Sequence, residues 1–511
     1  MFSLSKRGSI VRSTLLLTAV NLAMRAAGMV FQVFLSRRVG TAGLGLLTLT
    51  MTVGVLAMTA GAGGVRVASM YLCAAEHSRS RPGGVRAAMR CCLLYGLAVS
   101  CAVGAAVFAL SGFLARVWLL DERAASSLRI IGAFLPVTCL WGVFGGYFTA
   151  VGKVGRLVAV ELFERALSMA LTAAALVLWA GGNTERSCMA IIGGSSASSA
   201  LSLVVIAALY RREIAGRGAP CAPGMGWRLV RLAAPLGLAD CLRSGLSTLE
   251  HLLIPRGLTG ADGSYESSLA AYGTIHGMVF PVLMFPACVL YSLSDLLVPE
   301  LAGAAAAGRT RRIRGLARRC LRTTVLFSCA VSGALFVSAQ PLGLLVYRSA
   351  DAGRYLALFA PLVPMLYLDA IIDGMLKGLG EQVYCVRCNT LTSLLDVLLL
   401  LTLLPRYGIG GYFFSFTATH AVNFFLSAAR LLRVTDYDLA PGHLARAALS
   451  ALGAGAAALI VRAVLPPLPP FWRTAAPAGA YLAAFWALAR LTGALEPGAL
   501  SSLLAPLRRQ K

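Results

Sequence analysis

Charged residues are scarce in this 511-residue chain, and acidic residues are the scarcer kind. Asp, Glu, Lys and Arg make up 13% of the sequence, whereas a soluble domain carries about a quarter. The acidic residues number 21, against 46 Lys and Arg. Five histidines contain no His-Glu-x-x-His motif, and no metal-binding cluster is evident. The shortage of charge excludes a globular cytosolic protein, and nothing indicates a metal enzyme.

Nucleotide-binding and redox motifs are also missing. The stretch 146–153 has one residue too many for a P-loop, and Val154 stands where Ser or Thr is required. Cys385 and Cys388 have CxxC spacing, but they lack a second pair and a thioredoxin-like context. We therefore interpret them as small apolar residues. ATP-driven transport by this chain alone is not indicated, and energy would come from an ion gradient, the membrane potential or consumption of the product.

Long apolar runs are what the chain has in place of charge. Hydrophobic residues make up 58% of it, and the mean hydropathy is +0.76. Several uncharged runs can each cross about 30 Å of hydrocarbon. They are neither short nor alternating as in a β-barrel, so we predict an all-α polytopic membrane protein. The sequence divides into about fourteen spans: 13–35, 44–64, 89–114, 130–151, 157–179, 187–210, 229–254, 269–297, 321–346, 355–376, 383–404, 410–432, 444–464 and 474–491.

Basic residues are sorted between alternate connections of these spans. Counted together with the end residues of the adjoining spans, one set of connections, which includes both ends of the chain, holds 31 Lys and Arg, and the other holds 12. Basic loops stay on the cytoplasmic side, so we expect both termini in the cytoplasm and an uncleaved first helix. The net charge of +25 would suit nucleic acid, but it lies in short loops that face anionic lipid. Membrane lipids are therefore the expected partners, and nucleic acid is not.

An internal repeat is visible in the order of small and basic residues. Two sets match at offsets of 228 and 218: Pro136, Gly146 and Gly152 with Pro364, Gly374 and Gly380, and Arg25, Arg38 and Thr41 with Arg243, Arg256 and Thr259. A shift of six spans preserves orientation, so the halves would be parallel repeats with substrate bound between them. We predict an N-lobe at 1–215, a C-lobe at 216–435, and two extra helices with a cytoplasmic tail at 436–511.

Polar stripes on several spans predict a water-filled cavity, because a charged group at the centre of a span costs about 2.5–3.5 kcal/mol. Arg25 is the hardest of these residues to explain without a cavity, since its span carries no acidic residue that could pair with it. Arg243 occupies the matching position in the repeat. Arginine presents a planar fork that suits phosphate, which suggests a substrate bearing pyrophosphate. The candidate substrate-binding residues are Arg25, Arg38, Arg243, Arg256, Asn21 and Gln32.

Acidic and amide residues on other spans are candidates for ion coupling. No cofactor is expected, but oxygen ligands could hold Na⁺ or a proton. Simpler interpretations stay open: Asp240 and Arg243 could form an internal salt bridge, Lys377 could extend to the cytoplasmic surface, and His276 and His420 could be packed and hydrogen-bonded. The ion-coupling candidates are Asp240, Glu250, Asn389, Ser393, Asp396, Asp369 and Asp373.

Three stretches around the seventh and eighth spans carry a family resemblance: 247–258 (STLEHLLIPRGL), 271–281 (AYGTIHGMVFP) and 284–300 (MFPACVLYSLSDLLVPE). With 25–40 (RAAGMVFQVFLSRRVG), they resemble the stage V sporulation protein B branch of the polysaccharide transporters. This branch lies within the multidrug/oligosaccharidyl-lipid/polysaccharide exporter superfamily. Glu250 stands where the branch usually has Asp, and Gly257 replaces a frequent second Arg.

The resemblance implies two six-helix lobes, two extra C-terminal helices and flipping of a lipid-linked saccharide across the bacterial cytoplasmic membrane. Related lipid II flippases carry cavity arginines on the first helix and near the seventh, and Arg25, Arg38 and Arg256 match those regions. The substrate would be lipid II or a related precursor of cell wall, spore cortex or polysaccharide. Cell-wall synthesis enzymes are candidate partners, and we expect a monomer.

Three other functions remain open from the sequence. A cation-coupled multidrug exporter of the same superfamily would depend on acidic groups such as Asp369 and Asp373. A membrane-embedded polysaccharide polymerase or ligase would need a large polar external loop, and the external connections here are short. A scaffold protein that transports nothing would need a translocation assay to exclude it. The leading interpretation is a flippase and not an enzyme.

Overall fold

A computed structural model describes residues 4–79, 82–214, 224–262, 264–437, 441–464 and 469–495. Side chains are described within these ranges except for those of 4–22, 82, 214, 261–262, 295–296 and 441. Throughout the described ranges the regular structure is helical. The predicted all-α class is therefore confirmed for these residues.

The helices are given in chain order, with η1 and η2 as single π-helical turns and η3 as a 3₁₀ turn. They are α1 (Leu4–Ala62), α2 (Val65–Ser78), α3 (Pro82–Ala109), α4 (Ser111–Phe113), η1 (Leu114–Trp118), α5 (Ala124–Ala150), α6 (Val154–Leu178), α7 (Thr184–Ile214), α8 (Met225–Asp262), α9 (Tyr265–Thr274), η2 (Ile275–Val279), α10 (Phe280–Met284), α11 (Ala287–Ala306), α12 (Thr310–Tyr347), α13 (Ala350–Phe359), η3 (Ala360–Leu362), α14 (Val363–Gly378), α15 (Gln382–Thr435), α16 (Pro441–Val464) and α17 (Pro470–Leu491).

Nine helical stretches among the described residues are long and apolar enough to cross a membrane. Two of them are too long for one crossing, because 54 residues of straight helix would extend about 80 Å and the hydrocarbon core is about 30 Å thick. Both contain a glycine with non-helical backbone angles, Gly40 (φ 76°, ψ 174°) and Gly408 (φ 54°, ψ −133°). The chain is therefore a multi-pass membrane protein, while the total of fourteen spans stays a prediction.

The helix α15 folds back on itself at Gly408. The Tyr384 hydroxyl donates to the carbonyl of Leu426 at 3.3 Å, and Arg430 donates to Glu381 at 2.7 Å. These partners lie on opposite sides of Gly408 along the chain, 24 and 27 residues before it and 18 and 22 residues after it. The two halves of α15 are therefore antiparallel neighbours, which correspond to the predicted spans 383–404 and 410–432.

Contacts divide the chain into two compact units. One unit is Leu35–Gly273, and the other joins Met1–Phe34 to Thr274–Lys511. We call them the 35–273 unit and the 274–511 unit. The boundary at residue 34 lies within α1, so this division by contacts differs from the predicted division by repeat. The N-lobe, the C-lobe and the C-terminal pair accordingly remain a prediction.

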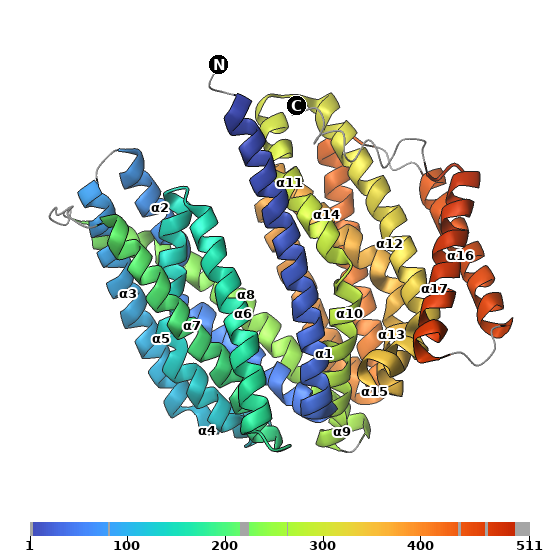
Figure 1. The fold of residues 1–511 in the computed structure, drawn as a ribbon, viewed down its shortest axis with the longest axis horizontal. Coiled ribbons are helices and arrows are strands. Elements are labelled where there is room, and N and C mark those ends of the chain that lie inside the picture. Colours follow the sequence, from blue (N-terminus) through green and yellow to red (C-terminus); the bar gives the residue numbers. More distant parts are fainter. Residues whose placement is uncertain are drawn as a thin grey trace. The chain divides into compact units, whose positions relative to one another are not determined.

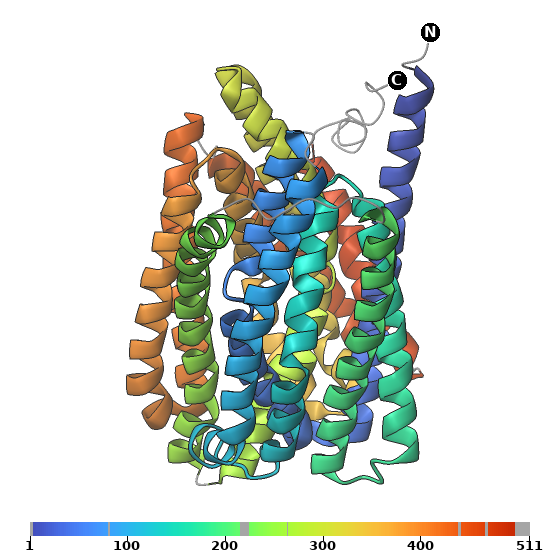
Figure 2. The same cartoon turned by 90° about the vertical axis from the view of Figure 1, so that its left-hand side faces the viewer.

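The 35–273 unit has its core among α2, α3, α5 and α7 (Figure 1). Figure 2 turns these helices toward the viewer and shows them running side by side. Small residues allow close packing of membrane helices, and Gly146 of α5 lies directly against the Ser69 hydroxyl of α2. Ser69 also donates to the carbonyl of Val143 at 3.2 Å. Buried aromatic and aliphatic side chains, with Phe148 fully enclosed, fill the space around this contact.

The 274–511 unit repeats this detail with different helices. Gly374 of α14 lies against the Ser294 hydroxyl of α11, as Gly146 lies against Ser69. The helices α5 and α14 also end alike: each is followed by a glycine with positive φ, Gly152 (73°) and Gly380 (85°). Such a left-handed glycine closes a helix by returning backbone N–H groups to its last carbonyls. These matched geometries support the repeat that the sequence predicts at an offset of 228.

The two C-terminal helices pack against α12 (Figure 1). The ring of Tyr481 on α17 fills the space above Gly333, where a β-carbon would overlap it. One turn earlier, the carbonyl of Cys329 accepts a hydrogen bond from the Tyr481 hydroxyl at 2.9 Å. The side chain of Tyr481 is fully buried in a small apolar cluster with Phe485 and Val337. This tyrosine therefore fixes the C-terminal pair to the rest of its unit.

We expect Gly333→Leu to destabilise the docking of α16 and α17 more than Tyr481→Phe does. The phenylalanine loses one hydrogen bond, worth about 1 kcal/mol, whereas the leucine must displace a buried ring, which costs about 1–3 kcal/mol or more. Thermal unfolding of the purified protein measures both. Gly455→Leu on α16 is the matched control, because a β-carbon at Gly455 meets nothing within 4 Å. Equal melting temperatures for the two leucine variants would contradict this account.

Candidate functional site

Arg25 lies on α1 in the 274–511 unit, and its side chain is exposed. Its guanidinium carbon is 6.0 Å from the ring centroid of Tyr291 on α11. A cation over an aromatic face gains about 0.5–1 kcal/mol at an exposed site, and its charge is not neutralised. Among the residues with described side chains, no carboxylate pairs with Arg25. The ring orients the guanidinium and leaves its charge available to an anion.

Gln32, two turns after Arg25, holds α1 to a π-helical turn. Its Nε2 donates to the carbonyl of Gly277 in η2 at 3.0 Å. Single π turns often occur at functional sites, and here the turn offers a carbonyl to another helix. The amide of Gln32 is thus engaged within its own unit. The predicted stripe on this helix also includes Asn21, whose side chain lies outside the described residues.

Arg243 and Asp240, both on α8 in the 35–273 unit, have exposed side chains. No ion pair joins them in the described part of the chain. The internal salt bridge considered from their spacing is therefore not formed. Arg38, on the second half of α1, is exposed as well.

Arg256, the fourth candidate arginine, is bound to backbone carbonyls at the end of η1. Its guanidinium donates to the carbonyl of Val117 and, at 3.1 Å, to that of Trp118. The hydroxyl of Tyr265 donates to the next carbonyl, that of Leu119. Cationic groups stabilise the last carbonyls of a helix in this way. In this arrangement Arg256 connects the α8–α9 region to η1 within its own unit.

The acidic candidates of α14 and α15 fall into two kinds. Asp373 forms an ion pair with Lys377 at 2.5 Å, one turn along α14. Asp369 and Asp396 have neutral neighbours: Asn423 donates to Asp369 at 3.0 Å, and Thr419 lies 3.3 Å from Asp396. The structure thus places two half-buried carboxyl groups beside neutral side chains of the second half of α15.

The neutral partners were missed by the sequence analysis, although a signal for them existed. Thr419 and Asn423 are four residues apart and so lie on one face of a helix. His420 lies between them in sequence, and its Nδ1 is 2.9 Å from the carbonyl of Phe416. His276 is 3.1 Å from the Tyr412 hydroxyl. Both histidines are thus packed and hydrogen-bonded, as the simpler interpretation predicted.

The remaining ion-coupling candidates lie on α15 and α8. Asn389 and Ser393 are half-buried on the first half of α15, and Glu250 is half-buried on α8 in the other unit. No group of three or more His, Cys, Asp or Glu residues in the described ranges could hold a metal ion. A cation site that joins α15 to Asp240 or Glu250 remains a prediction.

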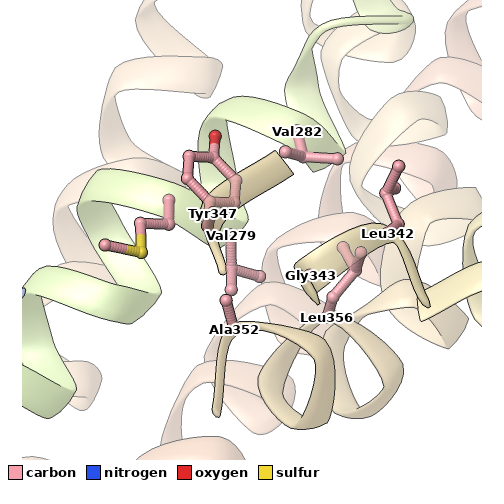
Figure 3. A pocket seen from close by; sticks show the side chains of 8 residues that line it. Val279, Val282, Leu342, Gly343, Tyr347, Ala352 and Leu356 are labelled. Carbon is pink, nitrogen blue, oxygen red and sulfur yellow. The ribbon is translucent and has the colours of Figure 1, made fainter. Parts of the chain in front are cut away.

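One partly open pocket in the 274–511 unit is apolar and small (Figure 3). Its room for the centre of a water-sized molecule is about 10 Å³, about what one water molecule needs. Its lining comes from η2, α10, α12 and α13, and includes Val279, Leu342 and Tyr347. It carries no charged group, so it is not a candidate for binding a sugar pyrophosphate.

The helices and their buried contacts define a polytopic α-helical membrane protein with the fold of known exporters. The structure matches the solved structure "Lipid II flippase MurJ, inward closed conformation" with a TM-score of 0.66 and 13% sequence identity, over 93% of this chain and 98% of that one. It matches an inward-facing multidrug resistance MATE family transporter of the MOP superfamily with a TM-score of 0.61 and 14% identity, over 81% and 96% of the two chains. At these identities the likeness establishes the fold.

Residues 10–299 match the family model described as "Polysaccharide biosynthesis protein". The chain belongs to this family, which is one of transporters and not of enzymes. A curated relative, "Stage V sporulation protein B" of Bacillus subtilis (strain 168), is 20% identical over 409 residues, which cover 79% of each chain. The family resemblance inferred from the sequence is thereby confirmed.

Proposed function

We propose that this transporter flips a polyprenyl-pyrophosphate-linked saccharide across the bacterial cytoplasmic membrane. The observation that carries the proposal is Arg25, an exposed cation that is oriented by Tyr291 and not neutralised by a described carboxylate. Arginine is charged at every physiological pH, and its fork matches the oxygens of a phosphate. A guanidinium in a membrane-spanning helix needs an anion to offset its cost, and a pyrophosphate would supply it.

The distribution of charge supports an anionic substrate over a cationic one. Arg25 and Arg243 are both exposed cations without a carboxylate partner among the described residues. The acidic group Asp373, which a cationic drug would need, is already paired with Lys377. These observations favour the flippase over the alternative of a cation-coupled multidrug exporter. The names of the similar proteins, a lipid II flippase and a sporulation protein, point to the same class of substrate.

Transport would proceed by alternating access between two six-helix lobes. With the two C-terminal helices, which follow the second lobe in the chain, the protein would have fourteen spans. Parallel repeats of this kind rock against each other around a central site. The matched endings of α5 and α14 and the matched Gly146 and Gly374 contacts support the repeat. With both termini in the cytoplasm, the headgroup would enter from the cytoplasmic side while its lipid tail stays in the bilayer.

Reconstituted vesicles test this proposal. A fluorescent lipid-linked saccharide is placed in the outer leaflet, and its movement to the inner leaflet is measured by protection from a quencher that cannot cross the membrane. We expect protection to appear with the protein and not in empty vesicles. A fluorescent organic cation is assayed in parallel. Export of the cation without movement of the saccharide would replace the flippase by the multidrug exporter.

A further inference from the structure

Arginines mark both ends of the C-terminal helix pair. Arg446 and Arg462 lie on α16, and Arg473 and Arg490 lie on α17. All four side chains are exposed. Neither helix contains Asp or Glu, nor does α12, against which both helices pack. Among the residues with described side chains, no carboxylate pairs with any of the four arginines. Their charges are therefore available to an anion from outside these helices.

The start of α16 and the end of α17 lie together, at the end of the 274–511 unit that also holds the start of α12 (Figure 1). The hydroxyl of Ser450, one turn after Arg446, is 3.1 Å from the hydroxyl of Thr492, two residues after Arg490. The start of α12 carries the basic stretch 309–322, and basic segments lie on the cytoplasmic side. The predicted topology therefore puts Arg446 and Arg490 at the cytoplasmic headgroups, and the other two arginines at the opposite end.

Arg490 lies over the ring of Trp486, one turn earlier on α17. Its guanidinium carbon is 3.6 Å from the ring centroid. A basic side chain near the end of a membrane helix usually extends toward the surface, but this contact turns Arg490 back toward the hydrocarbon. A cation at that depth needs an anion to offset its cost. The ring holds the guanidinium in place and leaves its N–H groups for a phosphate.

Arg446 brings a second guanidinium to the turn that ends α17. Its Nη1 lies 3.8 Å from the position that a β-carbon on Gly493 would occupy. The N–H of Gly493 donates to the carbonyl of Arg490 at 3.2 Å, so this glycine belongs to the turn that follows Arg490. The Ser450 hydroxyl donates to the carbonyl of Arg446 at 2.8 Å. Two arginines on neighbouring helices thus lie at the same helix end.

Exposed apolar side chains continue from the arginines toward the middle of the two helices. Leu449 and Leu452 of α16 are 63% and 73% exposed, and Leu482 and Trp486 of α17 are 46% and 49% exposed. The spacing of four residues from Leu482 to Trp486 and on to Arg490 puts these three side chains on one face of α17. Phosphate-binding groups above an apolar stripe suit a phosphate that is attached to acyl chains, and not a free phosphate ion.

From this arrangement we propose that the cytoplasmic end of the α16–α17 pair is a binding site for an anionic phospholipid. The headgroup phosphate binds Arg446 and Arg490, and an acyl chain lies along Leu482 and Trp486. A zwitterionic headgroup carries its own cation, which the arginines repel, so the site selects for net negative charge. The site uses none of the proposed substrate-binding arginines and does not rest on the proposed function. It ties the two helices outside the internal repeat to the anionic inner leaflet.

Native mass spectrometry of the purified protein tests the proposal. The protein in detergent is incubated with phosphatidylglycerol or phosphatidylcholine at equal concentrations, with and without inorganic phosphate. We expect phosphatidylglycerol to bind at least about tenfold more tightly, because hydrogen bonds between guanidinium and phosphate are charge-assisted. The double variant Arg446→Gln, Arg490→Gln should lose this preference. Inorganic phosphate should not displace the lipid, since it has no acyl chain.

The matched control is the double variant Arg462→Gln, Arg473→Gln. It removes the same charge from the other end of the same two helices and should keep the preference. Trp486→Leu keeps an apolar side chain but no longer holds Arg490, so its preference should be weaker than that of the native protein. Equal binding of both lipids to the native protein would overturn the proposal, as would equal losses in the two double variants. Displacement by inorganic phosphate would also overturn it and indicate a site for the free ion.

Arg25→Ala separates this site from the proposed function. Phosphatidylglycerol should bind this variant as it binds the native protein. Loss of the preference in Arg25→Ala would overturn the proposal, because the phospholipid would then occupy the substrate site. If the preference depends on Arg446 and Arg490 while no saccharide moves in vesicles, the phospholipid site stands and the flippase fails.

Discussion

Arg25→Ala is expected to abolish translocation of a lipid-linked saccharide while leaving the amount of folded protein unchanged. A guanidinium that grips a pyrophosphate makes two charge-assisted hydrogen bonds, each worth about 1.5–3 kcal/mol. Loss of both slows flipping by at least about a hundredfold. Folding should be spared, because Arg25 is exposed and its described contact is the ring of Tyr291. The measurement is the initial rate of flipping in vesicles that contain equal amounts of protein.

Two further variants distinguish the contributions of the positive charge, the planar guanidinium and the Tyr291 ring. Arg25→Lys keeps the charge but loses the planar fork, so its rate should lie between those of the native protein and Arg25→Ala. Tyr291→Phe keeps the aromatic face that orients Arg25 and should remain close to the native rate. Arg311→Ala, within the exposed basic stretch of α12, controls for the loss of one positive charge. An Arg25→Ala protein that flips at the native rate would remove the arginine from the transport mechanism.

The sequence predicted features that depend on local composition. Apolar length predicted the helical class, and recurring glycines predicted a repeat at an offset of 228, within which α5 and α14 end in the same way, at Gly152 and Gly380. Such helix endings require a residue that tolerates positive φ, and glycine, the residue that does so most readily, is visible in the sequence. Local sequence also made Arg25 a candidate, because a lone arginine in an apolar run is visible without any knowledge of the fold.

Long-range partners could not be predicted in this way. Arg256 was interpreted as a substrate ligand, but the carbonyls that it binds lie about 140 residues earlier, in a π-helical turn without a sequence signature. The partners of Asp369 and Asp396 likewise depend on the hairpin at Gly408, which brings Asn423 and Thr419 to them. Each of these contacts depends on which helices pack together, and the residue pattern of a single sequence does not show that pairing.

Gly273→Leu is expected to prevent the 35–273 unit from folding. Gly273, near the end of α9, lies against backbone atoms of the second half of α1: a β-carbon there would overlap the carbonyl of Thr41 and lie 2.5 Å from the nitrogen of Gly45. In return, a β-carbon at Gly45 would overlap the carbonyl of Leu269. Helices in membranes approach this closely only where both carry small residues. Backbone atoms cannot rotate aside as a side chain can, so one helix must move away from the other.

The cost should exceed the roughly 1–3 kcal/mol of ordinary overpacking, which is a large part of the stability of a typical domain. We expect Gly273→Leu to give little monodisperse protein after extraction, and Gly273→Ala to give protein with a lowered melting temperature. Gly155→Leu on α6 is the control in the same unit, because a β-carbon there meets nothing within 4 Å. Equal yield and melting temperature for Gly273→Leu and Gly155→Leu would show that α9 and α1 do not pack backbone to backbone. A graded loss from alanine to leucine, with the control unaffected, would instead locate the close contact at Gly45 and Gly273.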